Sequence, residues 1–312
     1  MPCYKPLTGW QSEQTNSNGK RPLVFSQPKN GEFKEMKIAC RLCIGCRLEY
    51  SRQWAMRIHH EQQLHKKNAF ITLTYDNEHL PENSSLDKRD WQLFLKKFRK
   101  KLYPAKIRFF MAGEYGGQAE LGRKFGRPHF HAIIFGWYPE KSDCKVVKKT
   151  KTGELLYHSE FLSEIWGKGF VSVGSVTFES AAYVARYITK KITGDIKDDH
   201  YTDIDFATGE SIKIEPEFTL SSRRPGIGGN WLKKYKTDLE KGYITVRGKK
   251  MNAAKFYDRK FEEIDPYGMD EIKQKRELLA LDNQETEERL AVKERKRMLK
   301  MKKFKRGLNL DS

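Results

Sequence analysis

Short runs of β-branched and aromatic residues, each bounded by loop-forming residues, predict buried strands at 69–75, 107–116 and 128–137. A similar run at 169–178 predicts a fourth strand, and residues 139–157 predict a basic hairpin. The connection between the second and third strands is short and rich in glycine. We therefore expect these two strands to be antiparallel neighbours.

Between these runs the apolar residues recur every three or four positions, which is typical of amphipathic helices. The clearest helix is at 87–102, where Lys and Arg fill the opposite face. Shorter patterns predict helices at 159–166 and from about Glu179, and residues 46–66 predict an earlier helix with a basic face. From the first strand onward, the order is strand, helix, strand, strand, helix, strand, helix. This order predicts an α+β fold with an antiparallel central sheet of split βαβ type, flanked by helices.

The other segments divide the chain into four regions. Residues 1–68 contain four of the five cysteines and the basic helix, and residues 69–195 contain the predicted core. The pattern weakens after that. We expect residues 196–260 to form a basic extension and residues 261–312 to form a highly charged helical tail.

The charge of the chain indicates a polyanionic partner. The 60 Lys and Arg residues against 41 Asp and Glu give a formal net charge of +19. Nucleic acid is the commonest partner of so basic a chain, although solubility and acidic lipid are alternatives. No apolar run approaches the roughly 20 residues that cross a bilayer, and the first residues do not resemble a secretion signal. We expect a cytoplasmic protein without a membrane segment.

A pair of histidines on the third predicted strand is a candidate metal site. His129 and His131 flank Phe130, and since side chains alternate across a strand, both imidazoles point to one face. Glu114 ends the neighbouring strand and can lie across from them. Two imidazoles and a carboxylate on a rigid sheet form a divalent-metal site with open positions, where a phosphate oxygen can bind. Histidines that face solvent or form hydrogen bonds are the alternative.

Two tyrosines on the last predicted core helix are candidate nucleophiles. Tyr183 and Tyr187 share a helix face, and Lys190 and Lys191 follow one turn later on nearly the same side. A phenol with a pKa of about 10 becomes competent when a metal polarises the target phosphate and cations favour the phenolate. Two such residues permit two successive transesterifications. An aromatic pair packed in the core is the alternative.

Three cysteines have a spacing that composition does not explain. Cys40, Cys43 and Cys46 form C-x2-C-x2-C, which five cysteines would produce by chance about 0.001 times in a chain of 312 residues. With Cys3 as the fourth ligand they form a candidate structural zinc site. An unmetallated reactive cluster is the alternative, an iron–sulfur site fits less well, and a disulfide is not expected in a cytoplasm. We expect Cys144 to be a separate thiol.

Other basic segments are candidate nucleic-acid contacts. Arg223 and Arg224 precede a glycine-rich turn whose backbone amides, together with the two guanidinium groups, can bind phosphate. An ordinary glycine-rich connector is the alternative. For the basic run at 293–306 we favour a solvated helix over a DNA contact. We expect His59 and His60 to be surface residues of the basic helix.

Taken together, these motifs resemble those of the HUH endonucleases. GRPHFHAIIFG resembles their His-hydrophobic-His metal motif, YVARYITKK their two-tyrosine helix, and FITLTYDN the strand motif that precedes both. Within that superfamily the chain resembles the replication initiators of the Microviridae, which are small single-stranded DNA bacteriophages. MPCYKPL, CIGCRLEYSRQWA and SRRPGIGGNW indicate the gokushovirus type. The superfamily motifs cover about residues 69–193, and the phage-specific similarity extends from residue 1 to about residue 231.

The resemblance implies a metal-dependent, site-specific DNA nickase that also joins strands. By this likeness Tyr183 and Tyr187 match the nucleophiles and His129 and His131 match the ligands of Mg²⁺ or Mn²⁺, while Glu114 matches the most variable ligand. The enzyme would nick the supercoiled duplex origin, stay bound through a 5′-phosphotyrosine, and close the displaced strand into a circle.

The resemblance also implies partners and a location. The partners would be duplex and single-stranded origin DNA, contacted in part by residues 196–260, in the cytoplasm of a bacterial host. The sequence has no G-x-x-x-x-G-K-[ST] motif, so a host helicase and a host DNA polymerase would have to cooperate. A plasmid or transposon nickase with one essential tyrosine is the alternative enzyme. A non-catalytic DNA- or RNA-binding protein is the alternative from another class.

Overall fold

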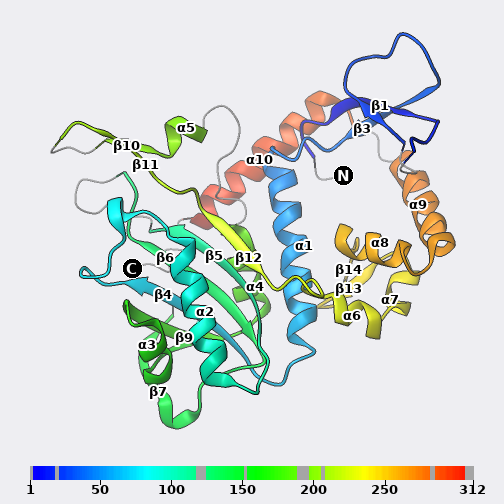
Figure 1. Cartoon of the computed structure of the whole chain (residues 1–312). Helices are drawn as coiled ribbons and strands as arrows, with labels where there is room; N and C mark the ends of the chain where they lie inside the picture. The colour runs from blue at the N-terminus through cyan, green and yellow to red at the C-terminus, as the bar shows by residue number, and fades with distance from the viewer. Residues whose placement is uncertain are drawn as a thin grey trace. The chain divides into compact units, whose positions relative to one another are not determined.

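The computed structural model describes residues 3–17, 21–116, 124–150, 153–187, 197–204, 208–281 and 285–305 (Figure 1). The chain forms two compact units. The larger unit comprises Ser51–Arg276 with Leu310–Ser312, and the smaller unit comprises Met1–Tyr50 with Glu277–Asn309.

The larger unit is built on a seven-stranded antiparallel sheet with the order β12-β5-β6-β4-β9-β8-β7. The strands are β4 (Asn68–Tyr75), β5 (Arg108–Tyr115), β6 (Pro128–Phe135), β7 (Cys144–Lys149), β8 (Leu155–Ser159), β9 (Gly169–Ser175) and β12 (Phe218–Ser221). β5 and β6 are directly paired, as their short connection predicted. The predicted α+β class with a large antiparallel sheet is confirmed.

Both faces of this sheet are covered, which explains why β5 and β6 are buried almost throughout. On one face lie α2 (Lys88–Leu102) and α3 (Glu160–Trp166), whose Trp91 and Trp166 pack with Phe130 of β6. Figure 1 shows α2 running across that face. On the other face lie α4 (Phe178–Tyr187) and part of α1 (Ile44–Gln62). Alternate residues of β4 are fully buried under α2 and α3, and those between them are partly buried on the face of α4.

The predicted core elements are confirmed, with ends that differ by a few residues. The helix at 87–102 begins after Asp87, whose carboxylate accepts a hydrogen bond from the Arg89 amide and so caps the first turn. The predicted hairpin is β7 and β8. The charged tail is helical in α9 (Pro266–Leu281) and α10 (Glu287–Lys305). Beyond the core, β12 adds an edge strand to the sheet, next to β5. The sequence did not predict it.

A second core in the larger unit is formed by elements that the sequence pattern left unassigned. They are α6 (Gly229–Lys234), α7 (Thr237–Glu240), β13 (Ile244–Val246), β14 (Lys249–Met251) and α8 (Lys255–Glu262). The first turns of α9, from the predicted helical tail, complete this core. His60 of α1 is only 1% exposed in this core. Its ring stacks on Trp231 at 3.7 Å between centroids, and its Nδ1 lies 2.9 Å from the Tyr257 hydroxyl. The expectation that His60 is a surface residue is therefore wrong.

The small hairpin of β10 (Thr202–Ile204) and β11 (Ser211–Lys213) follows α5 (Lys197–His200). The smaller unit contains a three-stranded antiparallel sheet of β1 (Leu7–Ser12), β2 (Leu23–Val24) and β3 (Phe33–Ile38), in the order β2-β1-β3. None of the helices described in either unit combines the length and the apolar character that a membrane crossing requires.

Candidate functional site

Glu114, His129 and His131 lie next to one another on the sheet face that carries α4. Glu114 is directly opposite His129 in the β5–β6 pair, and His131 is two residues further along β6. Because alternate residues of a strand share a face, the three side chains point to the same side. Their exposed fractions are 1%, 8% and 5%. The structure thus brings together the three residues that the sequence predicted as metal ligands.

Hydrogen bonds at the far side of each ring orient the two imidazoles. His129 Nδ1 lies 3.0 Å from the carbonyl oxygen of Arg127, which can only accept, so Nδ1 carries the proton. The other nitrogen, Nε2, lies 3.5 Å from Glu114 Oε1 and carries the lone pair in the neutral ring. The hydroxyl of Thr72, opposite His131 on β4, lies 2.9 Å from His131 Nδ1. Metal-binding histidines are commonly fixed in this way.

The donor set fits a divalent cation. One ligand atom from each of Glu114, His129 and His131 lies within 4.8 Å of the other two. Two imidazole nitrogens and one carboxylate oxygen supply three ligands, so that positions stay open for water or a phosphate oxygen. The strands beneath hold these ligands on a rigid support.

Tyr183 is the described side chain of the tyrosine pair, and it lies beside this cluster. Its ring centroid is 5.5 Å from that of His131 and 6.3 Å from that of Phe70, and the side chain is partly buried. The guanidinium carbon of Arg186 lies 5.9 Å from the Tyr183 ring centroid. A cation at this distance interacts favourably with the aromatic ring.

Tyr187 is the last residue of α4, one helical turn after Tyr183. Its side chain is outside what the structure describes, and Lys190 and Lys191 lie outside the described residues altogether. That Tyr187 shares a helix face with Tyr183 stays a prediction from the four-residue spacing.

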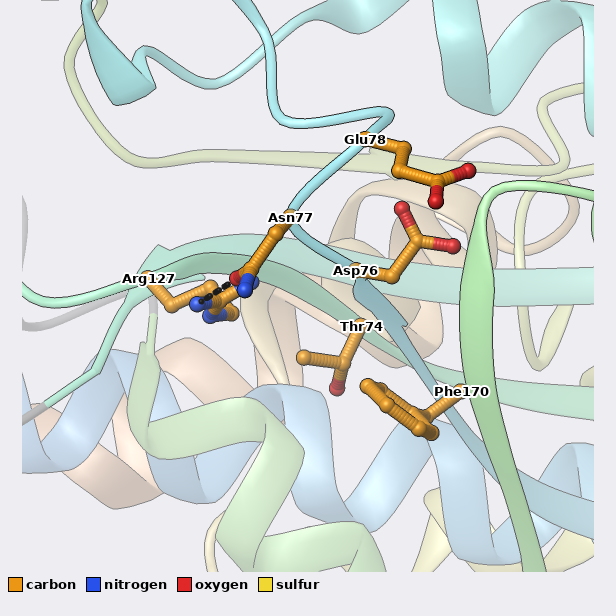
Figure 2. Close-up of a pocket in the computed structure, with 6 residues that line it drawn as sticks. All are labelled: Thr74, Asp76, Asn77, Glu78, Arg127 and Phe170. Atoms are coloured by element: carbon orange, nitrogen blue, oxygen red, sulfur yellow. Dashed lines mark hydrogen bonds between the residues drawn. The ribbon is translucent and has the colours of Figure 1, made fainter.

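A pocket of about 600 Å³ opens at the end of β4, close to the histidines (Figure 2). It is lined by Thr74, Asp76, Asn77, Glu78, Arg127 and Phe170. Arg127 donates to the Tyr75 carbonyl at 3.1 Å and to Asn77 Oδ1 at 2.7 Å, so its guanidinium group is held at the rim. Figure 2 shows the carboxylates of Asp76 and Glu78 turned toward each other on one side of the pocket and Phe170 beside Thr74 on the other.

The glycine-rich turn after Arg223 and Arg224 is packed against α1. The amide of Gly228 donates to Glu61 Oε2 at 2.7 Å, so this amide is already used within the protein. Gly228 has a φ of 80°, and a Cβ there would come within 2.3 Å of the Tyr257 hydroxyl. The backbone of the turn therefore serves the fold at Gly228. Both arginine side chains are exposed, and their role as DNA contacts stays a prediction.

Glu61 is a fully buried carboxylate that ties the sheet to this turn. Besides the Gly228 amide it accepts a hydrogen bond from Arg108 at 2.5 Å and lies 3.3 Å from His65 Nε2. Burial raises the pKa of Glu61, but the bonds from His65 and Gly228 and the charge of Arg108 outweigh it. The pKa of this carboxyl is therefore lowered from its usual range.

Replacing Glu61 by glutamine should lower the free energy of unfolding of the larger unit by about 3 kcal/mol, because it leaves Arg108 without its buried partner. Since the pKa of Glu61 is lowered by folding, its ionisation stabilises the native state above about pH 5, and this stabilisation is lost as the pH falls. The difference between the two proteins should therefore shrink in acid. Urea titrations at several pH values measure it.

Glu140→Gln is the matched control for this prediction. Glu140 pairs with Lys67 at 2.8 Å, but both side chains are exposed. Exposed pairs contribute about 1 kcal/mol or less, so this variant should be nearly as stable as the wild type. Equal effects of the two substitutions would show that the Glu61 network does not stabilise the larger unit.

The structure also brings together the sulfur atoms of Cys3, Cys40, Cys43 and Cys46 in the smaller unit. Cys144 lies in β7, separate from them, and all five cysteines are free thiols.

Three residues near the candidate site were not predicted from the sequence. Thr72 becomes visible only once the register of β4 against β6 is known, because it lies opposite His131. Arg186 lies between the two tyrosines on α4, and its spacing alone does not show that its guanidinium group lies over the Tyr183 ring. Phe170 has the pattern of a strand residue, and the sequence does not show that 68% of its side chain is exposed.

Comparison with known proteins gives consistent matches. The family model described as replication-associated protein ORF2/G2P matches residues 68–192. The chain is 33% identical over 256 residues to replication-associated protein VP4 of Bdellovibrio phage phiMH2K, covering 79% of this chain and 72% of that protein. It is 32% identical over 302 residues to replication-associated protein ORF2 of Spiroplasma virus 4, covering 90% and 87%.

A third relative matches over a shorter region. Replication-associated protein ORF4 of Chlamydia phage 1 is 37% identical over 160 residues, which is 49% of this chain and 38% of that protein. No solved structure matches the chain. The region matched by the family model runs from β4 through α4 and therefore contains the histidines, Glu114 and both tyrosines.

Proposed function

The chain belongs to the replication-associated proteins of the Microviridae, and from this membership and the site geometry we propose that it initiates rolling-circle replication of a circular single-stranded DNA genome. It would do so as an endonuclease that nicks one strand of the duplex origin with a tyrosine. The observation that carries the proposal is the position of Tyr183, whose ring lies 5.5 Å from that of His131 in a buried cluster with Glu114 and His129.

The topology supports assignment to the HUH endonuclease type. β5 and β6 pair directly, β4 lies between β6 and β9, and α2 and α3 both cover the face opposite the histidines. This is the arrangement expected of a split βαβ fold, with the catalytic face left to α4 and the DNA.

Glu114, His129 and His131 would hold Mg²⁺ or Mn²⁺, which draws charge from the phosphate under attack. Neighbouring residues orient the two histidine ligands. The Arg127 carbonyl fixes the tautomer of His129, and Thr72 orients His131. All three ligand side chains are buried, so the surrounding residues limit their movement.

One tyrosine oxygen would attack the phosphorus of the scissile phosphodiester. A bond forms between the phenolic oxygen and phosphorus, and the bond from phosphorus to the 3′-oxygen breaks. The phenol loses its proton, and the departing 3′-oxygen gains one to become the hydroxyl that primes synthesis. The phosphotyrosine keeps the energy of the phosphodiester, so the reverse attack by a 3′-hydroxyl can rejoin the strand without ATP.

The second tyrosine would cut the regenerated origin after one round, and the new 3′-hydroxyl would then attack the first phosphotyrosine to close the circle. Exposed Arg223 and Arg224 would bind the phosphates of flanking DNA. A helicase and a DNA polymerase of the bacterial host would open and copy the duplex in the host cytoplasm.

The test is an adduct assay. The protein is incubated with Mn²⁺ or Mg²⁺ and labelled single-stranded oligonucleotides that tile the phage origin. We expect one of them to yield a protein–DNA adduct that survives boiling in detergent. Salt-sensitive binding without any adduct would overturn the proposal and favour a non-catalytic nucleic-acid-binding protein.

A further inference from the structure

We propose that the smaller unit is organised by a structural zinc ion bound to Cys3, Cys40, Cys43 and Cys46. All four sulfur atoms lie within 4.8 Å of one another. The Cys3 sulfur is 3.6 Å from that of Cys40 and 3.9 Å from that of Cys43. A tetrahedral ZnS₄ site with Zn–S bonds of about 2.3 Å has sulfur–sulfur distances of about 3.8 Å.

The backbone brings these four residues together from two distant segments. Leu7 pairs with Ile38 at one end of the β1–β3 ladder, so the residues just before β1 meet those just after β3. Arg41, in the left-handed region with a φ of 63°, turns the chain between Cys40 and Cys43. Cys46 then lies in the first turn of α1.

Backbone amides are directed at the sulfur atoms. The amide of Tyr4 donates to Cys43 Sγ, that of Cys40 to Cys3 Sγ and that of Cys43 to Cys40 Sγ, each at 3.3 Å. Such bonds stabilise thiolates, which are the form that binds metal. They also fix the direction in which each sulfur points.

The described part of the smaller unit contains no other cluster of buried side chains. In its described part, Cys3 and Cys43 are the only side chains that are fully buried, apart from glycines. Leu7, Leu23 and Phe25 are all exposed. A unit of this kind cannot be held by apolar burial alone and needs covalent or metal cross-links. The sulfur–sulfur distances are far longer than the roughly 2.05 Å of a disulfide, which leaves the metal.

The distances between the sulfur atoms also indicate the kind of metal site. An iron–sulfur cluster places bridging sulfides and several iron atoms between its cysteine ligands, and four thiols within 4.8 Å leave no room for them. Four thiolates around one ion are typical of structural zinc.

Elemental analysis of purified protein tests this inference. We expect about one zinc per chain in the wild type, and little in Cys40→Ser or Cys43→Ser. Cys144→Ser is the matched control, because it removes a thiol outside the cluster and should keep the zinc. Limited proteolysis should cut the first fifty residues of the Cys40 and Cys43 variants faster, while the larger unit resists as in the wild type.

Co²⁺ substitution in the full-length wild-type chain provides a measurement that needs no variant. A tetrahedral thiolate site should give the visible absorption bands of cobalt bound by sulfur. Iron in place of zinc, less than about half an equivalent of any metal, or zinc that Cys40→Ser retains would each overturn the proposal. None of these measurements requires DNA cleavage.

The exposed side chain of Phe170 supports a second inference, which rests on the proposed function. We infer that its exposed ring stacks on a base of the single-stranded DNA beside the scissile phosphate. Phe170 is directly opposite Thr74, and Thr74 is directly opposite His129, so Phe170 lies on the same sheet face as the metal cluster. Two strand spacings put it roughly 10 Å from His129, within reach of a neighbouring nucleotide.

The pocket that Phe170 lines has room for such a base. It has a volume of about 600 Å³, and Arg127 is held at its rim. An exposed aromatic ring next to a cation is the usual platform on which single-stranded nucleic acid is bound. Phe170 is 68% exposed as a residue, so its side chain is accessible to a base.

Fluorescence anisotropy with a labelled single-stranded oligonucleotide, in a buffer without divalent ions, tests this inference. We expect Phe170→Ala to weaken binding by about tenfold and Phe170→Trp to restore it. The slope of affinity against salt should stay unchanged, because no phosphate contact is removed. Tyr103→Ala is the matched control, since Tyr103 is also exposed but caps α2 on the opposite side of the sheet.

Wild-type affinity in Phe170→Ala, or an equal loss in Tyr103→Ala, would overturn the stacking role. The proposed cleavage is tested separately, because this assay reports binding alone. A protein that binds through Phe170 but forms no adduct would contradict only the proposed function.

Discussion

Replacing His129 and His131 together by alanine should lower the rate of DNA cleavage on the order of a thousandfold and change DNA affinity by only a few-fold. A divalent cation stabilises the charge of a phosphoryl transition state by several kcal/mol, and each 1.36 kcal/mol corresponds to a factor of ten in rate. The variant keeps Glu114 but loses both nitrogen ligands. Its basic surface, which supplies the salt-sensitive part of binding, is unchanged. Single-turnover cleavage and anisotropy measure the two effects.

His158→Ala is the matched control, because His158 lies on β8 of the same sheet and takes no part in the cluster. A second variant, Glu114→Gln, keeps the size of a buried side chain and should raise the Mn²⁺ concentration needed for half-maximal cleavage. Wild-type cleavage by the double histidine variant, at any Mn²⁺ concentration, would show that the cluster is not the catalytic metal site.

The sequence predicted the centre of the larger unit because local pattern and tertiary structure agree there. β4 alternates between two layers, and its apolar positions face the thicker core under α2 and α3. The spacing of His129 and His131 then fixes a common face without knowledge of any other strand. To predict that Glu114 lies across from His129, the pairing of β5 with β6 also had to be known. The short connection between these strands indicated that pairing.

The sequence failed where burial depends on distant partners. His60 is polar and lies in a basic helix, yet Trp231 and Tyr257, which enclose it, come about 170 and 200 residues later. β12 has four residues and pairs with a strand about a hundred residues earlier, so neither its length nor its periodicity marks it. The smaller unit lacks the apolar periodicity that predicts helices and strands, since the buried side chains in its described part are cysteines.

In the proposed reaction, the charge of +19 and the buried cluster would contribute to different steps. Net charge acts over the whole surface, attracts DNA and is screened by salt. The cluster is almost closed to solvent, so its chemistry depends on the position of a few donor atoms. Salt should therefore weaken binding strongly while leaving the cleavage rate of DNA that is already bound nearly unchanged.

Changing Tyr183 and Tyr187 together to phenylalanine should abolish the detergent-resistant adduct, whereas each single change should leave some nicking. Phenylalanine removes only the oxygen that would attack phosphorus, and at Tyr183 it keeps the ring that packs on His131 and Phe70. Because two linked cuts are needed to release a circle, each single variant should still form an adduct but close few circles. Gel analysis of labelled origin DNA measures both products.

Tyr103→Phe is the control here, since that exposed hydroxyl lies at the end of α2, away from the histidines. It should form adducts and circles at the wild-type rate. An adduct in the double variant would mean that another residue attacks the DNA, and the role assigned to α4 would then be wrong. Full circle closure by either single variant would show that one hydroxyl suffices for both cuts, as in the alternative with a single essential tyrosine. The double change therefore tests the nucleophiles, and the single changes test whether two of them are needed.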